Sequence, residues 1–237
     1  MKKYILLMAM VAVQIATMAQ TVNVHFKNGQ KIEFSSDNID YVDFSAKASE
    51  PTLTPGQVVD LGLSVYWASC NLGATKPEEY GDLYRWGETS PFQEYTPYSY
   101  VDQSTGEYVD IGYEISGTEY DAATSALGSD WRMPTLNEME ELINKCVWEW
   151  KQINGINGYK ITGVNGNSIF LPAAGYYTLS RYLGYGYWLG YWTSTKNTFN
   201  TAFFLIKQDA GYYIYGYMKI YDGLTIRPVS SNANAAH

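Results

Sequence analysis

Histidine is almost absent from this sequence, and its absence excludes several kinds of catalytic site. The two histidines are His25, close to the N-terminus, and His237, the last residue. A Ser-His-Asp or Cys-His arrangement in the middle of the chain is therefore impossible. Histidine-based zinc sites fail for the same reason, and two cysteines cannot fill a four-thiolate site. We therefore expect no such catalytic residues, no metal and no cofactor.

Cysteine is equally scarce, and its count leaves two interpretations open. Cys70 and Cys146 are the only cysteines. An even number permits one disulfide, Cys70–Cys146, in an oxidising compartment. The alternative is a pair of buried free thiols, which is how many cysteines behave.

Long apolar runs are missing except at the N-terminus, where one predicts export. Two lysines precede the unbroken apolar run Ile5–Val13, and Thr17 and Ala19 then place small residues at the −3 and −1 positions of a cleavage site. A membrane span needs about 20 apolar residues, so this run is too short for one. Residues 1–19 therefore predict a cleavable signal peptide, with a membrane anchor as the alternative. We expect a periplasmic, cell-surface or secreted protein with no membrane span after cleavage.

Positive charge is also in short supply. Without the two lysines of the predicted signal peptide, 14 basic residues face 24 acidic ones, a net charge near −10. Nucleic acid is disfavoured as a partner, because its binding relies on neutralising phosphates with Lys and Arg. Tyrosine, in contrast, is abundant, with 23 residues. Tyrosine suits wet recognition surfaces, and it also favours strands, so we expect both uses.

The chain divides by composition into several parts. Alternating apolar residues on both sides of Asn28-Gly29 predict a hairpin, because both turn positions tolerate positive φ. Tyr41–Phe44 could add a third strand. The predicted organisation is a signal peptide over 1–19, a small β unit over 20–46, a linker over 47–56, a main domain over 57–229 and a disordered tail over 230–237.

The main domain has the pattern of an α+β fold with short antiparallel strands and long loops. Its clearest element is a helix from Leu136 to about Trp150, with Thr135 as N-cap and Glu138 completing a capping box. A second, short helix is predicted at Asp121–Leu127. The expected strands are Val58–Ala68, Tyr159–Val164, Ser168–Leu171, Gly190–Ser194, Ala202–Lys207, Tyr212–Tyr221 and Leu224–Val229.

A series of motifs in the main domain resembles a known family. The motifs are Val59–Ala68, Tyr80–Asp82, Trp86–Thr89, Trp131–Thr135, Asn167–Gly175, Tyr191–Thr195 and Ile226–Val229. In content and order they resemble the Fibrobacter succinogenes major paralogous domain family over about residues 57–229. The resemblance implies a C-type-lectin-like fold related to the formylglycine-generating-enzyme-like branch.

Departures from relatives of that fold bear on activity and metal binding. Formylglycine-generating enzymes use a closely spaced cysteine pair, whereas these two cysteines lie 76 positions apart, which argues against that activity. The sugar-binding motifs of calcium-dependent lectins, such as Glu-Pro-Asn, do not occur. Four acids could still offer oxygens to calcium, or form a solvated acidic loop, which is the interpretation that we favour. They are Glu78, Glu79, Asp82 and Glu88.

The candidate ligand-binding residues lie in the C-terminal aromatic stretch. Rings separated by Gly, Ser and Thr in a loop region resemble a paratope. The candidate residues are Tyr176, Tyr177, Tyr182, Tyr185, Tyr187, Trp188, Tyr191, Tyr213, Tyr215 and Tyr217. The fold resemblance implies a ligand-binding face in this region, which retroelements that mutate adenines diversify in some members. Arg132 and Arg227 are instead expected to be half-buried structural residues.

These observations predict an exported, non-catalytic binding protein whose aromatic surface meets a glycan or a protein. A structural or tip subunit of a fimbria-like surface assembly is the alternative. A carboxylate-dependent hydrolase comes third, because acids are plentiful but no pair is singled out.

Overall fold

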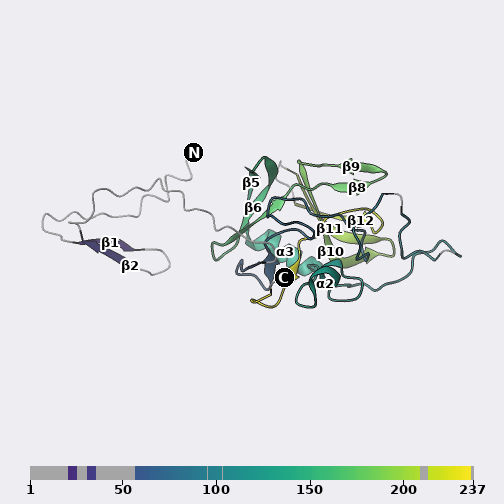
Figure 1. Cartoon of the computed structure of the whole chain (residues 1–237), viewed down its shortest axis with the longest axis horizontal. Coiled ribbons are helices and arrows are strands. Elements are labelled where there is room, and N and C mark those ends of the chain that lie inside the picture. Colours follow the sequence, from purple (N-terminus) through teal and green to yellow (C-terminus); the bar gives the residue numbers. More distant parts are fainter. Residues whose placement is uncertain are drawn as a thin grey trace. The chain divides into compact units, whose positions relative to one another are not determined.

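The computed structural model describes residues 21–25, 31–35, 57–94, 96–102, 104–208 and 213–235 (Figure 1). The chain divides into two units, Met1–Pro51 and Thr52–His237. In the first unit, β1 (Thr21–His25) pairs antiparallel with β2 (Lys31–Ser35), as the hairpin pattern predicts. The signal peptide, the Asn28-Gly29 turn, the third strand and the linker lie outside the described residues.

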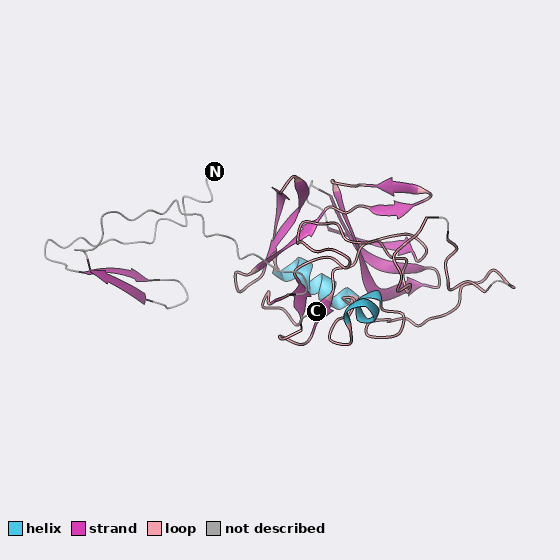
Figure 2. Cartoon of the chain, viewed as in Figure 1, coloured by secondary structure: helices cyan, strands magenta, loops and turns pink. Residues whose placement is uncertain are grey.

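The second unit is mostly antiparallel β structure with two short helices, an α+β arrangement (Figure 2). The helices are α2 (Ala122–Leu127) and α3 (Leu136–Lys145), and α3 packs against strands β10 and β11. One sheet joins β3 (Val58–Val59), β4 (Tyr66–Ala68) and β13 (Val229–Ser230). A second sheet joins β5 (Val147–Ile153), β6 (Ile156–Thr162) and β7 (Ser168–Pro172), and a third joins β10 (Trp188–Thr198), β11 (Thr201–Gln208) and β12 (Tyr213–Lys219). The strands β8 (Tyr176–Thr178) and β9 (Arg181–Leu183) form a hairpin of their own.

In Figure 1 the sheet of β10, β11 and β12 lies between the helices and the β8–β9 hairpin. In Figure 1 the two helices lie along the lower edge of this unit, and β8 and β9 lie along its upper edge. No helix in the described part of the chain is both long and apolar enough to cross a membrane.

Helix α3 begins where the sequence predicts but ends earlier. The Thr135 hydroxyl accepts a hydrogen bond from the Glu138 amide at 3.3 Å, and the Glu138 carboxylate accepts one from the Thr135 amide at 2.8 Å, which confirms the capping box. The helix ends at Lys145 rather than near Trp150, which lies in β5. Tryptophan favours a strand when it packs across one, and Trp150 packs on Tyr159 of β6 with ring centroids 5.0 Å apart.

Two predictions for the C-terminal segment are wrong. The predicted strand Leu224–Val229 does not form before Val229, which begins β13, because the backbone bonds of this segment go to separate partners such as Tyr84 through isolated bridges. The tail, predicted to be disordered over 230–237, is ordered through Ala235. That alanine is buried and packs with the small hydrophobic cluster of Trp131.

The core contains a buried arginine at the crossing of several segments. The Arg227 side chain is fully buried, deeper than the half-buried position that we expected. Its Nε donates to Asn71 Oδ1 at 2.8 Å, and its Nη2 donates to the Phe170 carbonyl at 2.8 Å. Nη1 donates to the carbonyls of Ala68 and Ser69 at 3.0 and 2.7 Å. One guanidinium therefore holds together residues up to 159 positions apart in the sequence. Arg132, as expected, is a partly buried structural residue paired with Glu138.

Both cysteines are free thiols and form no disulfide with each other, but only Cys70 is buried, whereas Cys146 is partly exposed. Their surroundings differ: Cys70 is buried beside Ser69 and Arg227, whereas Cys146 caps α3 and packs against the hydrophobic cluster of that helix. Burial raises the pKa of the Cys70 thiol, and burial together with the Glu141 carboxylate raises the pKa of Cys146 to about 11.

Replacing Arg227 by lysine should strongly destabilise the domain. Lysine keeps the charge but cannot reach four acceptors in a planar fork, so buried carbonyls lose their donors. We expect a loss of at least about 3 kcal/mol in the free energy of unfolding, measured by urea denaturation. The matched control is Arg181→Lys at an exposed position, which should change the free energy of unfolding by less than about 0.5 kcal/mol. Equal stability of the two variants would contradict the role given to Arg227.

The free thiols predict the outcome of thiol titration. Denatured without reductant, the protein should release two titratable thiols per chain. The native protein should react slowly, because a raised pKa leaves little thiolate at neutral pH. A protein exported through an oxidising compartment that yields no titratable thiol after denaturation would contradict this assignment.

Candidate binding surface

The candidate surface is built on the β8–β9 hairpin, where the sequence predicts only a glycine-punctuated loop. Tyr177 pairs with Tyr182, and Thr178 pairs with Arg181, which leaves a two-residue loop. That loop is Leu179 and Ser180, with φ of 48° and 58°. Positive φ at both positions is the geometry of a type I′ turn, whose favoured sequence is Asn-Gly. The hairpin was missed because Leu-Ser carries no turn signal.

The backbone of the hairpin is fixed to the rest of the domain. The amide of Tyr177 donates to the Gly223 carbonyl at 2.8 Å, and the Gly223 amide returns a bond to the Tyr177 carbonyl at 2.9 Å. The Thr178 hydroxyl bonds to the carboxylate of Asp222, the residue before Gly223. Main-chain bonds to Gly223, together with the bond between Thr178 and Asp222, thus hold the hairpin against the rest of the domain.

The loop that follows the hairpin is equally well held. The Gly186 amide donates to the Ala173 carbonyl at 2.8 Å, and Asn157 Nδ2 donates to the Gly186 carbonyl at 3.0 Å. Gly184 has φ of 70°, and a Cβ there would lie 2.5 Å from the Trp188 ring. The loop therefore packs closely and needs glycine at this point.

A continuous row of five aromatic rings crosses the hairpin. Centroid distances are 4.7 Å between Phe92 and Tyr177, 6.5 Å between Tyr177 and Tyr182, 5.6 Å between Tyr182 and Tyr185, and 4.5 Å between Tyr185 and Tyr80. All four contacts are tilted or edge-on, which is the preferred arrangement of aromatic pairs. We call these five residues the aromatic row.

Both ends of the aromatic row are anchored in the fold. At one end the buried Arg85 guanidinium lies 4.6 Å from the Phe92 centroid and donates to the Thr96 carbonyl at 2.7 Å. At the other end Asn71 Nδ2 donates to the Tyr80 carbonyl at 2.8 Å. The Phe92 ring and the main chain of Tyr80 are therefore held in place by the fold, and a surface fixed in this way would lose little entropy on binding.

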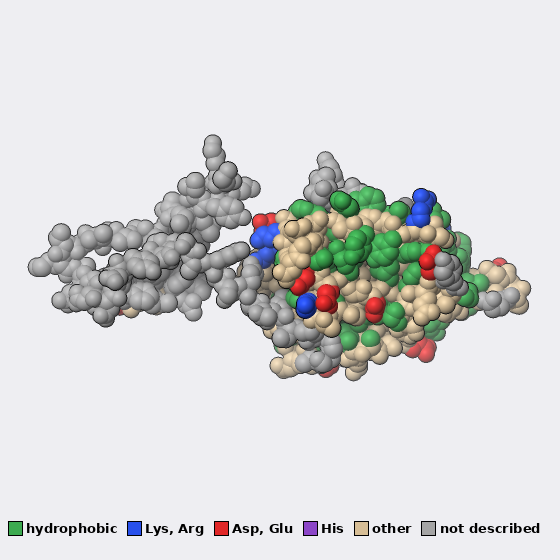
Figure 3. Space-filling model, turned by 45° about the horizontal axis from the view of Figure 1, so that its top comes forward, with side chains coloured by type: hydrophobic (Ala, Val, Ile, Leu, Met, Phe, Trp, Pro, Cys, Tyr) green, Lys and Arg blue, Asp and Glu red, His purple; other side chains and the backbone are tan. Residues whose placement is uncertain are grey.

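Exposed rings gather around this row. The exposed fractions are 44% for Tyr182, 56% for Tyr185 and 66% for Tyr187, and that of Leu179 at the hairpin tip is 80%. Figure 3, in which the edge carrying β8 and β9 comes forward, shows hydrophobic side chains spread across this face. Burial raises the pKa of Tyr182 to about 12, so its hydroxyl stays neutral at ordinary pH.

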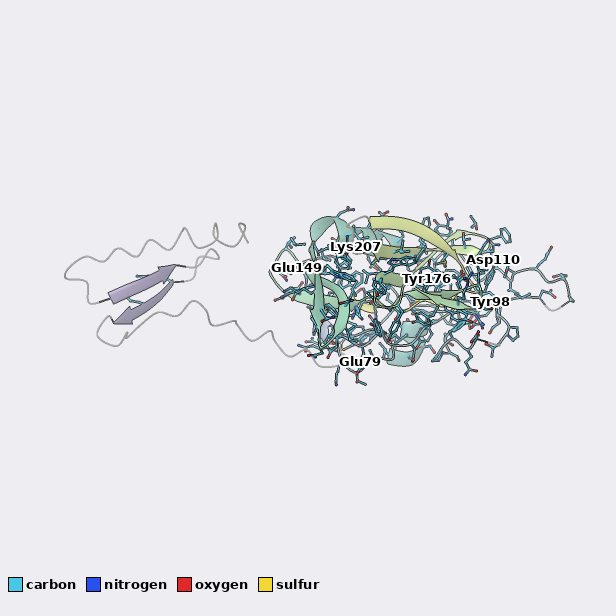
Figure 4. All side chains as sticks on the ribbon, turned by 90° about the horizontal axis from the view of Figure 1, so that it is seen from above. Glu79, Tyr98, Asp110, Glu149, Tyr176 and Lys207 are labelled. Atoms are coloured by element: carbon cyan, nitrogen blue, oxygen red, sulfur yellow. The ribbon has the colours of Figure 1, made fainter. Side chains whose placement is uncertain are left out.

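Two of the predicted binding residues support the surface from beneath. Tyr176 stacks on Trp188 with centroids 6.2 Å apart and contacts Phe204 of β11 at 6.5 Å. Both are only partly exposed. Figure 4 shows Tyr176 near the middle of the domain, with Lys207 toward one end and Tyr98 toward the other.

Tyr191 does not belong to the surface, and its prediction is corrected. Its side chain is fully buried within β10, next to Arg227. Its hydroxyl donates to the Pro172 carbonyl at 2.8 Å and accepts from Asn71 Nδ2 at 3.1 Å. Both faces of β10 are buried around this position, so the Tyr191 side chain is not accessible to a ligand.

The three remaining candidates lie in a different sheet. Tyr213, Tyr215 and Tyr217 belong to β12, with their backbones opposite Lys207, Leu205 and Phe203 of β11. Their side chains lie outside what the structure describes. The hairpin and β12 are separate parts of the sheet topology.

The acidic loop over 78–88 spreads its carboxylates among separate partners. Glu79 accepts bonds from the backbone amides of Thr75 and Lys76, and Glu88 accepts from the Ser99 amide at 2.7 Å. Glu78 accepts from Asn154 Nδ2. Within the described ranges, no group of three or more His, Cys, Asp or Glu residues is placed to hold a metal ion.

A second aromatic group, which the sequence analysis did not single out, lies over 98–120 and nearby turns. Tyr108 contacts Tyr98, Phe199 and Tyr221 with centroids 6.1 to 6.2 Å apart. The signal was five tyrosines in 23 residues. The same segment also holds five acids, and its Asp110 pairs with Lys196 at 2.8 Å. Residues 176–188, in contrast, hold no acid and one cation, Arg181.

Comparison of the chain with protein-family models, with curated proteins and with solved structures finds no match.

Asp222 makes the anchoring of the hairpin depend on pH. Burial raises its pKa from 3.8 to about 6, although bonds from Thr178 and the Lys219 amide favour the charged form. The folded protein thus binds this proton more tightly than the unfolded chain, so stability falls as pH rises from about 4 to about 6. Asp222→Asn should raise the free energy of unfolding at pH 8 by roughly 1–3 kcal/mol and change it little at pH 4. Thermal denaturation at both pH values checks this, with the exposed Asp130→Asn as control. An equal gain at both pH values would contradict the assignment.

Proposed function

We propose that this chain is an exported, non-catalytic binding protein with a C-type-lectin-like domain, and that the β8–β9 hairpin presents its ligand-binding surface. The observation that carries the proposal is the set of exposed rings on a backbone that is already fixed. Tyr182, Tyr185 and Tyr187 are exposed, while Tyr177 and Gly186 hold the main chain beneath them. The ligand is a glycan or a protein outside the cytoplasm.

Tyrosine on a fixed backbone supports a binding role for physical reasons. Each ring offers a large contact area and loses little conformational freedom on binding, since it has only two side-chain torsions. The hydroxyl allows contact with polar groups as well as apolar ones. Such rings suit either the face of a sugar or the surface of a protein.

The family resemblance supports the fold assignment through the positions of its motif residues. Trp67, Trp86, Trp131 and Trp192 come from four different motifs, and all are fully buried. Arg227, from the last motif, is fully buried as well. Motifs that supply the core are what a shared scaffold requires, with recognition residues lying between them.

The proposal is tested by removing the exposed rings and leaving the supporting ones. Tyr185→Ala combined with Tyr187→Ala should weaken ligand binding at least tenfold, because central aromatic side chains carry most of the energy of such contacts. Binding is measured on a glycan array and on an array of bacterial and host surface proteins.

The control is Tyr113→Ala combined with Phe199→Ala, which removes two equally exposed rings elsewhere. It should leave binding unchanged. Undiminished binding by the Tyr185/Tyr187 variant, or an equal loss of binding in both variants, would contradict the site assignment.

A further inference from the structure

We infer that the ligand of this surface is a protein, and that Leu179 at the hairpin tip enters an apolar pocket on it while Arg181 meets an acidic rim. The inference rests on the proposed function and names the partner class and the residues that select it. Three observations carry it: the turn geometry, the exposure of Leu179 and the charge of the hairpin.

The first observation is the sequence of the turn. Another hairpin of this chain has the same turn geometry with the residues that favour it. The β5–β6 hairpin has the same two-residue loop, with Asn154 and Gly155 at φ of 49° and 84°. The β8–β9 hairpin places Leu179 and Ser180 in that geometry instead. Left-handed backbone is unfavourable for leucine and is easily adopted by asparagine and glycine. Residues held in such conformations cluster at sites of function.

Exposure of Leu179 is the second observation. Its side chain is 80% exposed, the highest value among the large hydrophobic side chains of the described residues. Single exposed leucines are common, but here exposure coincides with an unfavourable backbone conformation. Neither turn preference nor packing within the chain accounts for leucine at this position. Contact with a partner accounts for both features.

Charge is the third observation, and it favours a protein over a glycan. Residues 176–188 contain six aromatic residues, one arginine and no Asp, Glu or Lys, in a chain of net charge −8. Enrichment in Tyr, Trp and Arg with depletion of Lys, Glu and Asp is the composition of a protein–protein interface core. Among the hydroxyls of the hairpin, that of Thr178 bonds to Asp222 and is therefore not available to a sugar.

The chemistry of the partner follows from these side chains. An apolar pocket on the partner would accommodate Leu179, and carboxylates on the partner would pair with the exposed Arg181 on β9. The expected epitope therefore combines Leu, Phe or Trp with neighbouring Asp or Glu. Electrostatic attraction between the two surfaces would make association depend on salt.

The test uses the full exported chain, immobilised, with a phage-displayed library of random dodecapeptides as probe and a glycan array in parallel. Selected peptides should combine apolar and acidic residues. Their affinity should fall at least tenfold for the double variant Leu179→Asn, Ser180→Gly, which installs the turn of the β5–β6 hairpin and keeps the fold. Arg181→Gln should weaken binding at low salt more than at high salt.

The stability of the double variant provides an independent readout. Because Asn-Gly relieves the unfavourable turn, its melting temperature should rise by a few degrees while binding falls. The control is Val164→Asn, which removes another exposed apolar side chain and should change peptide binding by less than twofold. An unchanged or lower melting temperature, or undiminished peptide binding, would overturn the inference.

Failure of the inference is distinguishable from failure of the proposed function. Glycan binding that is lost on changing Tyr185 and Tyr187 but kept in the Leu179/Ser180 variant would leave the proposed function standing and overturn the choice of a protein. A wild-type chain that selects no peptide and binds no glycan or surface protein would overturn both.

Discussion

The domain depends on the burial of one guanidinium group. Removing an arginine from water is unfavourable unless its donors find partners, and Arg227 finds acceptors on Asn71, on the two carbonyls at the end of β4 and on β7. Asn71 in turn donates to the Tyr80 carbonyl and to the Tyr191 hydroxyl. The same network thus fixes the main chain of Tyr80, whose ring is the last of the aromatic row. The core and the aromatic row are therefore connected through a few hydrogen bonds.

Local signals in the sequence predicted the elements that depend on neighbouring residues, and failed where distant contacts decide. The N-terminus of α3, the short helix α2 and the β6–β7 hairpin follow from capping and turn residues close in the chain. The end of α3 does not, because the apolar residues up to Trp150 also fit a helical period. The Asn154-Gly155 turn and the pairing of β5 with β6, in which Trp150 packs on Tyr159, place these residues in a strand instead. The β8–β9 hairpin was hidden because its turn residues are unfavourable for the turn that they form.

The tyrosines could be recognised as a group but not sorted by role. Tyr187 and Tyr191 are four residues apart, yet one is exposed and the other is completely buried. Tyr98 is buried as well, and its hydroxyl donates a hydrogen bond to the Trp86 carbonyl at 2.7 Å. Composition predicts that many tyrosines must be accommodated, whereas the packing of other segments around each strand and the hydrogen-bond partners decide which of them face water. The candidate site was therefore predicted as a region, and the structure was needed to divide it into contact residues and supports.

The way in which the hairpin is attached has an evolutionary consequence. Its hydrogen bonds to Gly223 and those of its loop to Ala173 come from the main chain, and Gly184 supplies the close packing. The outward side chains at 179, 181, 182, 185 and 187 make none of these bonds. If the surface binds a ligand as proposed, substitutions at these positions would change its specificity while leaving the main-chain bonds that hold the hairpin intact. The residues that hold the hairpin in place are thus different from the residues that form its outer surface, and only the first group is constrained by the fold.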